Sequence, residues 1–221
     1  MSVTYDNIVS AQQEQGDVIR KTSLTFSDTF TEITGSTVYL KNEFEQKTGS
    51  FKLRGAYYKI KTLSSEERKN GVVAASAGNH AQGVAFASAL EKISCTIIMP
   101  KNASPAKIAA TRGYGATVVL EGKNYDESWT KAQEIAKTTG STIIHAFDDS
   151  QIIAAQGVIG LEIIEQLPDV DEIYVPIGGG GLASGVLTAV KSKNPNVKII
   201  GVQSKSFPSM KNSLDSGNIE T

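Results

Sequence analysis

The chain has 221 residues, a length that allows one large or two modest α/β domains. Its formal net charge at pH 7 is −1. This near-neutral charge gives no support for binding to nucleic acid or to a membrane surface. One cysteine excludes a disulfide within the chain, no apolar run approaches the roughly 18 residues of a membrane-spanning helix, and the amino terminus lacks the features of a signal peptide. We therefore expect a soluble, cytoplasmic protein.

Apolar strands alternate with amphipathic helices along most of the chain. Valine- and isoleucine-rich runs predict strands at residues 38–41, 72–76, 96–99, 117–120, 142–145, 172–175 and 198–202. Apolar spacings of three and four predict helices at residues 5–15, 52–63, 81–90, 104–113, 126–138, 151–167 and 182–193. Residues 64–67 are expected to begin a polar connection. This alternation predicts βαβ units and a buried parallel sheet.

The first candidate functional residue is Lys52, which follows the run Thr48-Gly49-Ser50-Phe51. This run opens with turn residues and then becomes helical, with Ser50 as the predicted N-cap. A helix N-terminus carries partial positive charge, so a lysine there loses its proton more easily. The neutral amine is the form that attacks a carbonyl. Taken alone, the stretch favours an ordinary helix with a surface lysine, and the case for a reactive lysine depends on motifs further along the chain.

Two loops follow predicted strands, at the edge where open α/β sheets bind ligands. The first is Ser76-Ala77-Gly78-Asn79-His80, where backbone N–H groups at a helix start can bind a carboxylate and the Asn79 amide can bond a ring oxygen. The second is Gly178-Gly179-Gly180-Gly181, where glycines let the backbone approach an anion closely. The alternatives are a capped helix start for the first loop and a purely structural role for the second.

Other classes of site lack their required residues. The glycine run fits G-x-G-x-x-G/A, but the strand after it ends Gly201-Val202-Gln203-Ser204, without the acidic residue that binds a dinucleotide ribose. Neither the nucleoside-triphosphate motif G-x-x-x-x-G-K-[ST] nor the serine-hydrolase motif G-x-S-x-G occurs. With two histidines and one cysteine, the chain lacks the ligands of a zinc site. We predict no metal site.

Three motifs in sequence order resemble the fold-type-II pyridoxal-phosphate enzymes, and most closely their catabolic (biodegradative) threonine dehydratases. They are the segments 48–56, 76–83 and 178–182, and the resemblance extends from about residue 5 to residue 221. It implies an α/β, tryptophan-synthase-β-like fold with two open parallel-sheet domains and the cofactor between them. The large cofactor domain would contain residues 1–52 and 147–221, and the small domain residues 53–146.

The resemblance also implies a role for each motif. Lys52 would bind pyridoxal 5′-phosphate covalently and later remove the α-proton of the substrate, while Phe51 packs beside the pyridine ring and Asn79 bonds the 3′-oxygen. The cofactor phosphate would rest on Gly178, Gly179, Gly180 and Gly181. The substrate carboxylate would bind the N–H groups of Ser76, Ala77, Gly78, Asn79 and His80.

These roles imply elimination of water and ammonia from L-threonine, and from L-serine, with 2-oxobutanoate as the product from threonine. Serine racemases of the same family are the nearest alternative. They carry a serine that acts as a second base where this chain has Ala77, and a glutamate cation ligand where it has Gln203, so elimination is favoured over racemisation. Family members continue past Thr221, so an inactive cofactor- or effector-binding fragment is the alternative from another class.

The resemblance further implies regulation and assembly. Catabolic threonine dehydratases are commonly stimulated by a nucleoside monophosphate bound between subunits. The corresponding positions in this chain are Lys47, Thr48, Gln82 and Tyr114. We therefore expect an AMP-type effector and a homo-oligomer.

Overall fold

The computed structural model describes residues 2–220, whose contacts divide the chain into two compact units. Unit 1 contains the described residues up to Gln13 and from Phe147 onward, and unit 2 is Glu14–Ala146. The predicted domain division after residue 52 concerns the complete family fold and stays a prediction. None of the described helices combines the length and the apolar character needed to cross a membrane.

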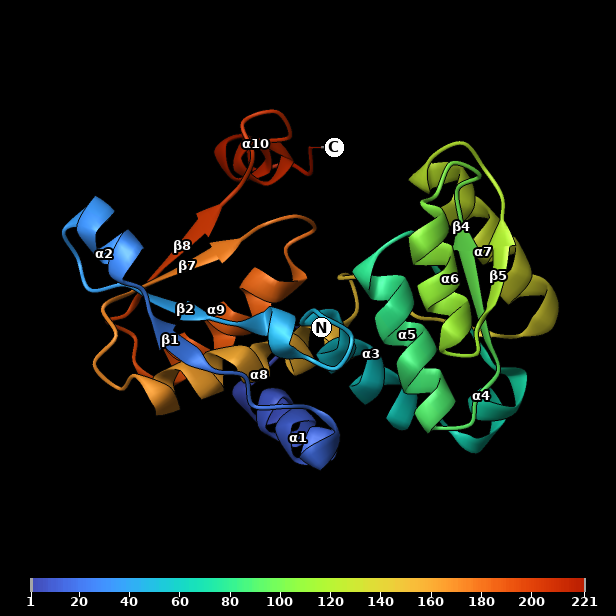
Figure 1. Ribbon diagram of the computed structural model, residues 1–221, viewed down its shortest axis with the longest axis horizontal. Helices are drawn as coiled ribbons and strands as arrows, with labels where there is room; N and C mark the ends of the chain where they lie inside the picture. The colour runs from blue at the N-terminus through green and yellow to red at the C-terminus, as the bar shows by residue number, and fades with distance from the viewer. Residues whose placement is uncertain (1, 221) are drawn as a thin grey trace. The chain divides into compact units, whose positions relative to one another are not determined.

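A four-stranded parallel sheet forms the centre of unit 2, with the strand order β5-β4-β3-β6. Figure 1 labels β4 and β5 of this sheet. The strands are β3 (Val72–Ala75), β4 (Cys95–Met99), β5 (Thr117–Leu120) and β6 (Thr142–Ile143). All four were expected from their apolar runs, and the prediction of parallel βαβ units is confirmed here. β3 is buried along its whole length, as a central strand covered on both faces must be.

Helices cover this sheet because its strands present apolar side chains to both faces. The helices that pack on the strands are α5 (Asn79–Leu90), α6 (Pro105–Gly113) and α7 (Tyr125–Thr139). α3 (Lys52–Lys61) packs on α5, and α4 (Ser65–Asn70) precedes β3 in sequence. On one face, Val73, Ala75 and Ile98 form a core with Ala132 of α7. Strand side chains alternate, so the intervening residues point to the opposite face, where α5 packs on β3 and β4.

The polar connection expected at residues 64–67 is instead the start of a short helix, α4. The Ser64 hydroxyl accepts a hydrogen bond from the Glu67 N–H at 3.3 Å, and the Glu67 carboxylate accepts one from the Ser64 N–H at 2.8 Å. This reciprocal arrangement is a capping box, which the sequence pattern S-x-x-E predicts. The prediction of a plain connection was wrong because it overlooked this signal.

The segment before Lys52 also departs from the prediction of a parallel sheet. β1 (Leu24–Phe26) pairs antiparallel with β2 (Tyr39–Lys41), and α2 (Asp28–Thr34) lies between them. The rings of Phe26 and Tyr39 stand directly opposite each other and pack edge to face, with centroids 5.7 Å apart. Such a cross-strand aromatic pair stabilises strands that are too short to show a sequence period.

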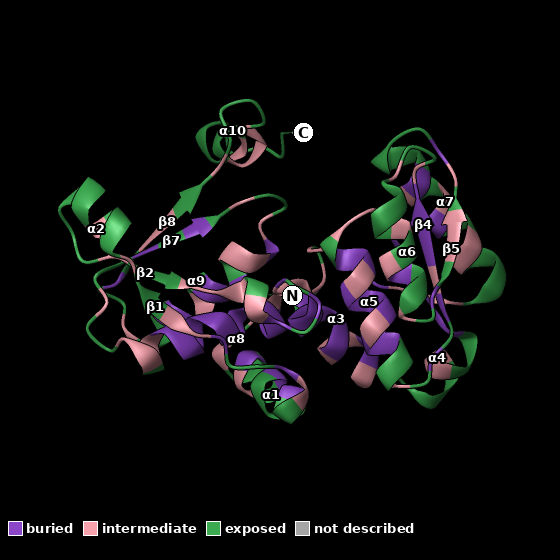
Figure 2. Ribbon diagram, viewed as in Figure 1, coloured by how far each residue is buried: buried purple, intermediate pink, exposed green. Residues whose placement is uncertain are grey.

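Unit 1 contains a second, two-stranded parallel sheet made of β7 (Glu172–Pro176) and β8 (Lys198–Val202). Its helices are most of α1 (Tyr5–Gln15), α8 (Ser150–Gln166), α9 (Gly181–Lys193) and α10 (Ser209–Ser216). The backbones of α8 and α9 nearly touch: a Cβ on Gly185 would lie 2.3 Å from the Ile153 carbonyl oxygen and 2.7 Å from the Gly157 nitrogen. Buried residues of this unit therefore concentrate along α8 and α9 (Figure 2).

Candidate active site

Lys52 occupies the first turn of α3, as predicted, but Ser50 does not cap this helix. Phe51 is the N-cap, and no side-chain hydrogen bond caps the helix. Ser50 lies one residue before this N-cap. Its hydroxyl is buried without a hydrogen-bond partner among the described residues. The predicted N-cap was wrong, although the helix start was placed correctly.

The Lys52 side chain is largely withdrawn from water. Its Nζ donates a hydrogen bond to the Ala146 carbonyl at 2.7 Å and lies 5.3 Å from the centroid of the Phe51 ring. Burial lowers the pKa of the Lys52 amine, because desolvation penalises the charged form. A larger neutral fraction makes the amine a better nucleophile and base. The cause is desolvation, whereas the sequence argument relied on the helix N-terminus.

The Ser76–His80 loop of the prediction runs from the end of β3 into α5, because Asn79 and His80 are the first two residues of that helix. The predicted helix start at residue 81 was therefore two residues too late. Gly78 is the N-cap, with φ −145° and ψ −140°, and none of the described side chains caps this helix. The Gly78 N–H donates to the Ser76 hydroxyl at 3.2 Å, which shapes the loop ahead of the helix. First-turn N–H groups without a side-chain cap suit the binding of a carboxylate.

His80 connects this loop to the segment that also holds Lys52. Its Nε2 lies 2.8 Å from the Ile144 carbonyl oxygen, and because a carbonyl oxygen only accepts, Nε2 must carry the hydrogen. Burial lowers the pKa of His80 to about 4, so the imidazole is neutral near pH 7. Ile144 and Ala146 follow β6 directly, and their carbonyls bring the predicted covalent residue and the predicted substrate loop together in unit 2.

The glycine run lies in unit 1, between β7 and α9. Gly180 is the N-cap of α9 with φ +87°, and no described side chain caps this thirteen-residue helix. A Cβ on Gly179 would lie 2.3 Å from the Phe147 ring, and one on Gly181 would lie 2.5 Å from the Phe147 carbonyl oxygen. Packing and backbone conformation therefore account for three of the four glycines, and the uncapped N–H groups of α9 remain suited to a phosphate.

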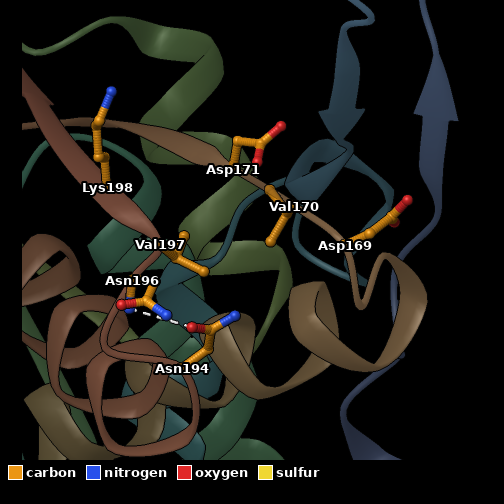
Figure 3. Close-up of a pocket in the computed structure, with 7 residues that line it drawn as sticks. All are labelled: Asp169, Val170, Asp171, Asn194, Asn196, Val197 and Lys198. Carbon is orange, nitrogen blue, oxygen red and sulfur yellow. Dashed lines mark hydrogen bonds between the residues drawn. The ribbon is translucent and has the colours of Figure 1, made fainter.

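A pocket of about 440 Å³ elsewhere in unit 1 contains none of the predicted site residues (Figure 3). Its lining residues are Asp169, Val170, Asp171, Asn194, Asn196, Val197 and Lys198. They cluster at the amino-terminal ends of β7 and β8, whereas ligands of open parallel sheets bind at the carboxyl ends. Among the described residues, no group of three or more His, Cys, Asp or Glu side chains is placed to hold a metal ion.

Comparison with known proteins identifies the family. A family model described as "Pyridoxal-phosphate dependent enzyme" matches residues 16–221. The chain belongs to this family. The match to the family model therefore includes Lys52 and both candidate loops, rather than one motif.

Two relatives show which branch of the pyridoxal-phosphate-dependent family the chain resembles. It is 54% identical over 218 residues to L-threonine ammonia-lyase from Thermotoga maritima, which covers 99% of this chain and 54% of that protein. It is 46% identical over 221 residues to the catabolic L-threonine dehydratase TdcB from Escherichia coli K12, covering all of this chain and 67% of that protein. The chain thus spans between about half and two thirds of the length of these relatives.

Solved structures of the same family share the fold. The structure of maize serine racemase matches with a TM-score of 0.96 at 33% identity, covering 100% of this chain and 67% of that one. Threonine deaminase isoform 2 from Solanum lycopersicum matches with a TM-score of 0.93 at 40% identity, covering 99% of this chain and 62% of that one. The α/β fold of type-II pyridoxal-phosphate enzymes is thereby confirmed.

The residues of this family member fit pyridoxal phosphate when each unit is considered by itself. Unit 2 offers a half-buried lysine whose pKa is lowered by burial, which suits a covalent bond to an aldehyde. Unit 1 offers an uncapped helix start with a glycine at positive φ, which suits a phosphate. The carbonyls of Ile144 and Ala146 and the ring of Phe147 were missed from sequence, because a backbone acceptor carries no side-chain signature.

The four predicted effector residues all lie in unit 2. Lys47 is exposed, whereas Thr48 is buried and its hydroxyl has no hydrogen-bond partner among the described residues. Gln82 precedes Phe86 by one turn of α5, and the Phe86 ring packs edge to face against Tyr114 at 5.5 Å. Tyr114 therefore packs against the face of α5 that carries both Phe86 and Gln82.

Proposed function

We propose that the protein is a pyridoxal-phosphate-dependent threonine ammonia-lyase, which converts L-threonine, and also L-serine, to a 2-oxo acid and ammonia. One observation carries the proposal: the desolvated Lys52 amine and the Ser76–His80 loop share the Ile144–Ala146 segment. The support from sequence is 46–54% identity, along nearly the whole chain, to two proteins named for this activity.

The roles of the residues follow from their chemistry. Lys52 would hold the cofactor covalently, Phe51 would pack beside its ring and Asn79 would bond its 3′-oxygen. The N–H groups of the Ser76–His80 loop would bind the substrate carboxylate, and the neutral Lys52 amine would take the α-proton on Nζ. The bound cofactor serves as the electron sink for the charge left on the α-carbon.

We also propose, from the family resemblance, that the phosphate rests on residues 178–181 and that the complete family fold holds the cofactor between two open parallel-sheet domains. The phosphate site is supported by the start of α9, where no described side chain caps the helix and Gly180 has φ +87°. An AMP-type effector at Lys47, Thr48, Gln82 and Tyr114, and a homo-oligomeric assembly, remain proposals from the family resemblance. Titration of AMP during turnover tests the effector, since an unchanged KM for threonine would reject it.

Serine racemase activity is the second candidate, because the maize serine racemase structure matches this chain closely. Racemisation requires an acid or base on each side of the α-carbon. In the Ser76–His80 loop, the position that holds a serine in the racemases is Ala77, whose methyl group cannot exchange a proton. Elimination needs only the one base that Lys52 supplies, so it is the better supported reaction.

The decisive experiment measures 2-oxobutanoate and ammonia from L-threonine with added pyridoxal 5′-phosphate. We expect equal amounts of both products from the wild type, and a rate lower by about 10²- to 10⁴-fold in Lys52→Ala, because the base is lost. Lys59→Ala, in the same helix, serves as the matched control and should keep the wild-type rate.

Two other outcomes identify the alternatives. Formation of D-serine from L-serine at a rate comparable to elimination would favour the racemase. Covalent attachment of the cofactor to Lys52 without any 2-oxo acid would favour an inactive cofactor-binding fragment.

A further inference from the structure

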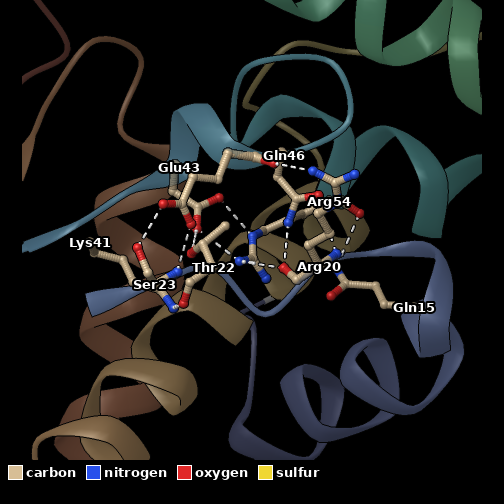
Figure 4. A network of polar contacts seen from close by, with 9 residues as sticks. Gln15, Arg20, Thr22, Ser23, Lys41, Glu43, Gln46 and Arg54 are labelled. Carbon is tan, nitrogen blue, oxygen red and sulfur yellow. Dashed lines mark hydrogen bonds and ion pairs between the residues drawn. The ribbon is translucent and has the colours of Figure 1, made fainter. Parts of the chain in front are cut away.

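Arg54, two residues after Lys52, has a fully buried side chain. Its Nε and Nη2 donate to the two carboxylate oxygens of Glu43, each at 2.8 Å, and Nη2 also donates to the Arg20 carbonyl at 3.3 Å (Figure 4). This two-bond geometry is the strongest and most directional form of an ion pair. It fixes where the arginine lies relative to the 3-10 turn Glu43–Glu45.

Further hydrogen bonds hold the acceptors of this arginine in place. The Thr22 hydroxyl donates to Glu43 Oε1 at 2.7 Å. The Gln46 amide accepts from the Arg20 N–H at 3.2 Å and donates to the Arg20 carbonyl at 2.5 Å. The guanidinium of Arg54 therefore donates to acceptors up to 34 residues away in sequence. These acceptors, Glu43 and the Arg20 carbonyl, are held by their own hydrogen bonds to Thr22 and Gln46.

The same arginine belongs to the helical turn that carries Lys52. The Arg54 carbonyl accepts a hydrogen bond from the buried Gln15 side chain at 3.2 Å. Gly83 of α5 packs on this turn so closely that a Cβ there would lie 3.2 Å from the Lys52 carbonyl carbon. The backbone that carries the lysine is thus fixed by α5 and by the hydrogen bonds of Arg54.

A buried ion pair is weak evidence for stability, because apolar side chains of similar volume often hold a fold equally well. Its advantage over such side chains is a fixed orientation, since the N–H groups of a guanidinium donate to both oxygens of a carboxylate in one geometry only. A fixed orientation matters for a reacting amine, because a displacement of the amine by about 1 Å can lower the reaction rate by up to about a hundredfold.

We propose that the Arg54–Glu43 pair is a positioning device that sets the orientation of Lys52 for reaction with the cofactor carbonyl. The inference rests on the proposed function, in which Lys52 is the covalent residue. Arg54 acts through the backbone of the first turn of α3. It is therefore a positioning residue and not a catalytic one.

The test measures the rate at which Lys52 of the 221-residue chain becomes covalently attached to pyridoxal 5′-phosphate. The adduct is trapped with borohydride and located by peptide mapping, and the unfolding midpoint is measured in parallel. The principal variant is Arg54→Met with Glu43→Met, which removes both charges and leaves neither one buried alone. We expect attachment at Lys52 to slow by about tenfold or more, with the fold retained.

A second ion pair of unit 2 provides the matched control. Arg68 Nη2 lies 2.8 Å from Glu91 Oε2, and joins α4 to the residue after α5. Arg68→Met with Glu91→Met should leave the attachment rate unchanged, whatever it does to the unfolding midpoint. A conservative variant, Arg54→Lys, keeps the charge opposite Glu43 but loses the fork, and should give an intermediate rate.

Equal attachment rates in the wild type and the Arg54–Glu43 double variant would overturn the proposal, as would equal slowing in the control pair. If the double variant does not fold, Arg54→Lys decides: an unchanged rate rejects positioning, and a folded but slower variant supports it. Failure of the proposed function would look different, because wild-type Lys52 itself would then not be labelled.

Discussion

His80 is a buried histidine kept neutral by its surroundings, and this has a consequence for stability. Burial lowers its pKa from 6.5 to about 4 in the folded chain, whereas the unfolded chain keeps an ordinary histidine pKa. Below pH 6.5 the unfolded state therefore binds a proton that the folded state does not. The free energy of unfolding should fall between pH 6.5 and pH 4, by up to about 3 kcal/mol from this group.

The measurement compares urea unfolding of the wild type and of His80→Gln at several pH values in this range. The variant should lose this part of the pH dependence while keeping the part that comes from carboxylates. Trp129, the single tryptophan, packs 5.1 Å from the His145 ring and supplies a fluorescence signal in the same unit. Parallel pH curves for the two proteins would show that His80 does not titrate as argued.

Residue types and spacing single out Lys52, the Ser76–His80 loop and the glycine run as candidates, because each has a recognisable sequence pattern. They were not sufficient for Ser50, since residue spacing does not show whether a hydroxyl makes a hydrogen bond to an N–H group of the helix. The carbonyls of Ile144 and Ala146 could not be found at all, because only the folded chain shows which backbone oxygen faces a given amine. The sequence thus offers candidates where residue types define a pattern, and it is silent where backbone atoms make the contact.

At the scale of elements, the contact between α3 and α5 determines where Lys52 lies. A Cβ at Gly83 would lie 3.2 Å from both the Lys52 carbonyl carbon and the Leu53 nitrogen. Both are backbone atoms, which cannot move away by a change of rotamer. Gly83→Ala should therefore separate the two helices and lower the free energy of unfolding by about 1–3 kcal/mol. It should also slow covalent attachment of the cofactor to Lys52.

Gly113→Ala is the control for this substitution. Gly113 also lies in a helix, α6, but a Cβ there would meet nothing within 4 Å. Alanine should be neutral there or stabilise the helix by about 0.5–1 kcal/mol. If Gly83→Ala behaved like Gly113→Ala in both unfolding and attachment, the close packing of α3 on α5 would have no bearing on Lys52.

Elements with a long apolar period were predictable, and short ones were not. β3, β4, β5, β7 and β8 each follow from a run of β-branched residues. β1 has three residues, too few to show an alternation, and was missed. β2 was predicted at residues 38–41, but its antiparallel pairing with β1 was not. α10 (Ser209–Ser216) has no buried residue, so no core-facing stripe marks it in the sequence.

At the scale of the whole molecule, the two units differ in how the chain builds them. Unit 2 is continuous from Glu14 to Ala146 and contains its own four-stranded sheet, whereas unit 1 is assembled from two separate segments. A continuous unit with its own core can fold alone. We therefore expect the fragment Glu14–Ala146 to unfold cooperatively, as followed by Trp129 fluorescence.

This fragment makes it possible to test the contribution of the glycine run, because it keeps Lys52 but lacks residues 178–181. The whole chain should attach pyridoxal 5′-phosphate faster than pyridoxal, by about tenfold or more, because an uncapped helix start stabilises a phosphate by up to about 2 kcal/mol. The fragment should react with both aldehydes at similar rates, since pyridoxal differs only in lacking the phosphate. A fragment that kept the full preference would place the phosphate site within unit 2, and the proposed role of the four glycines would then be wrong.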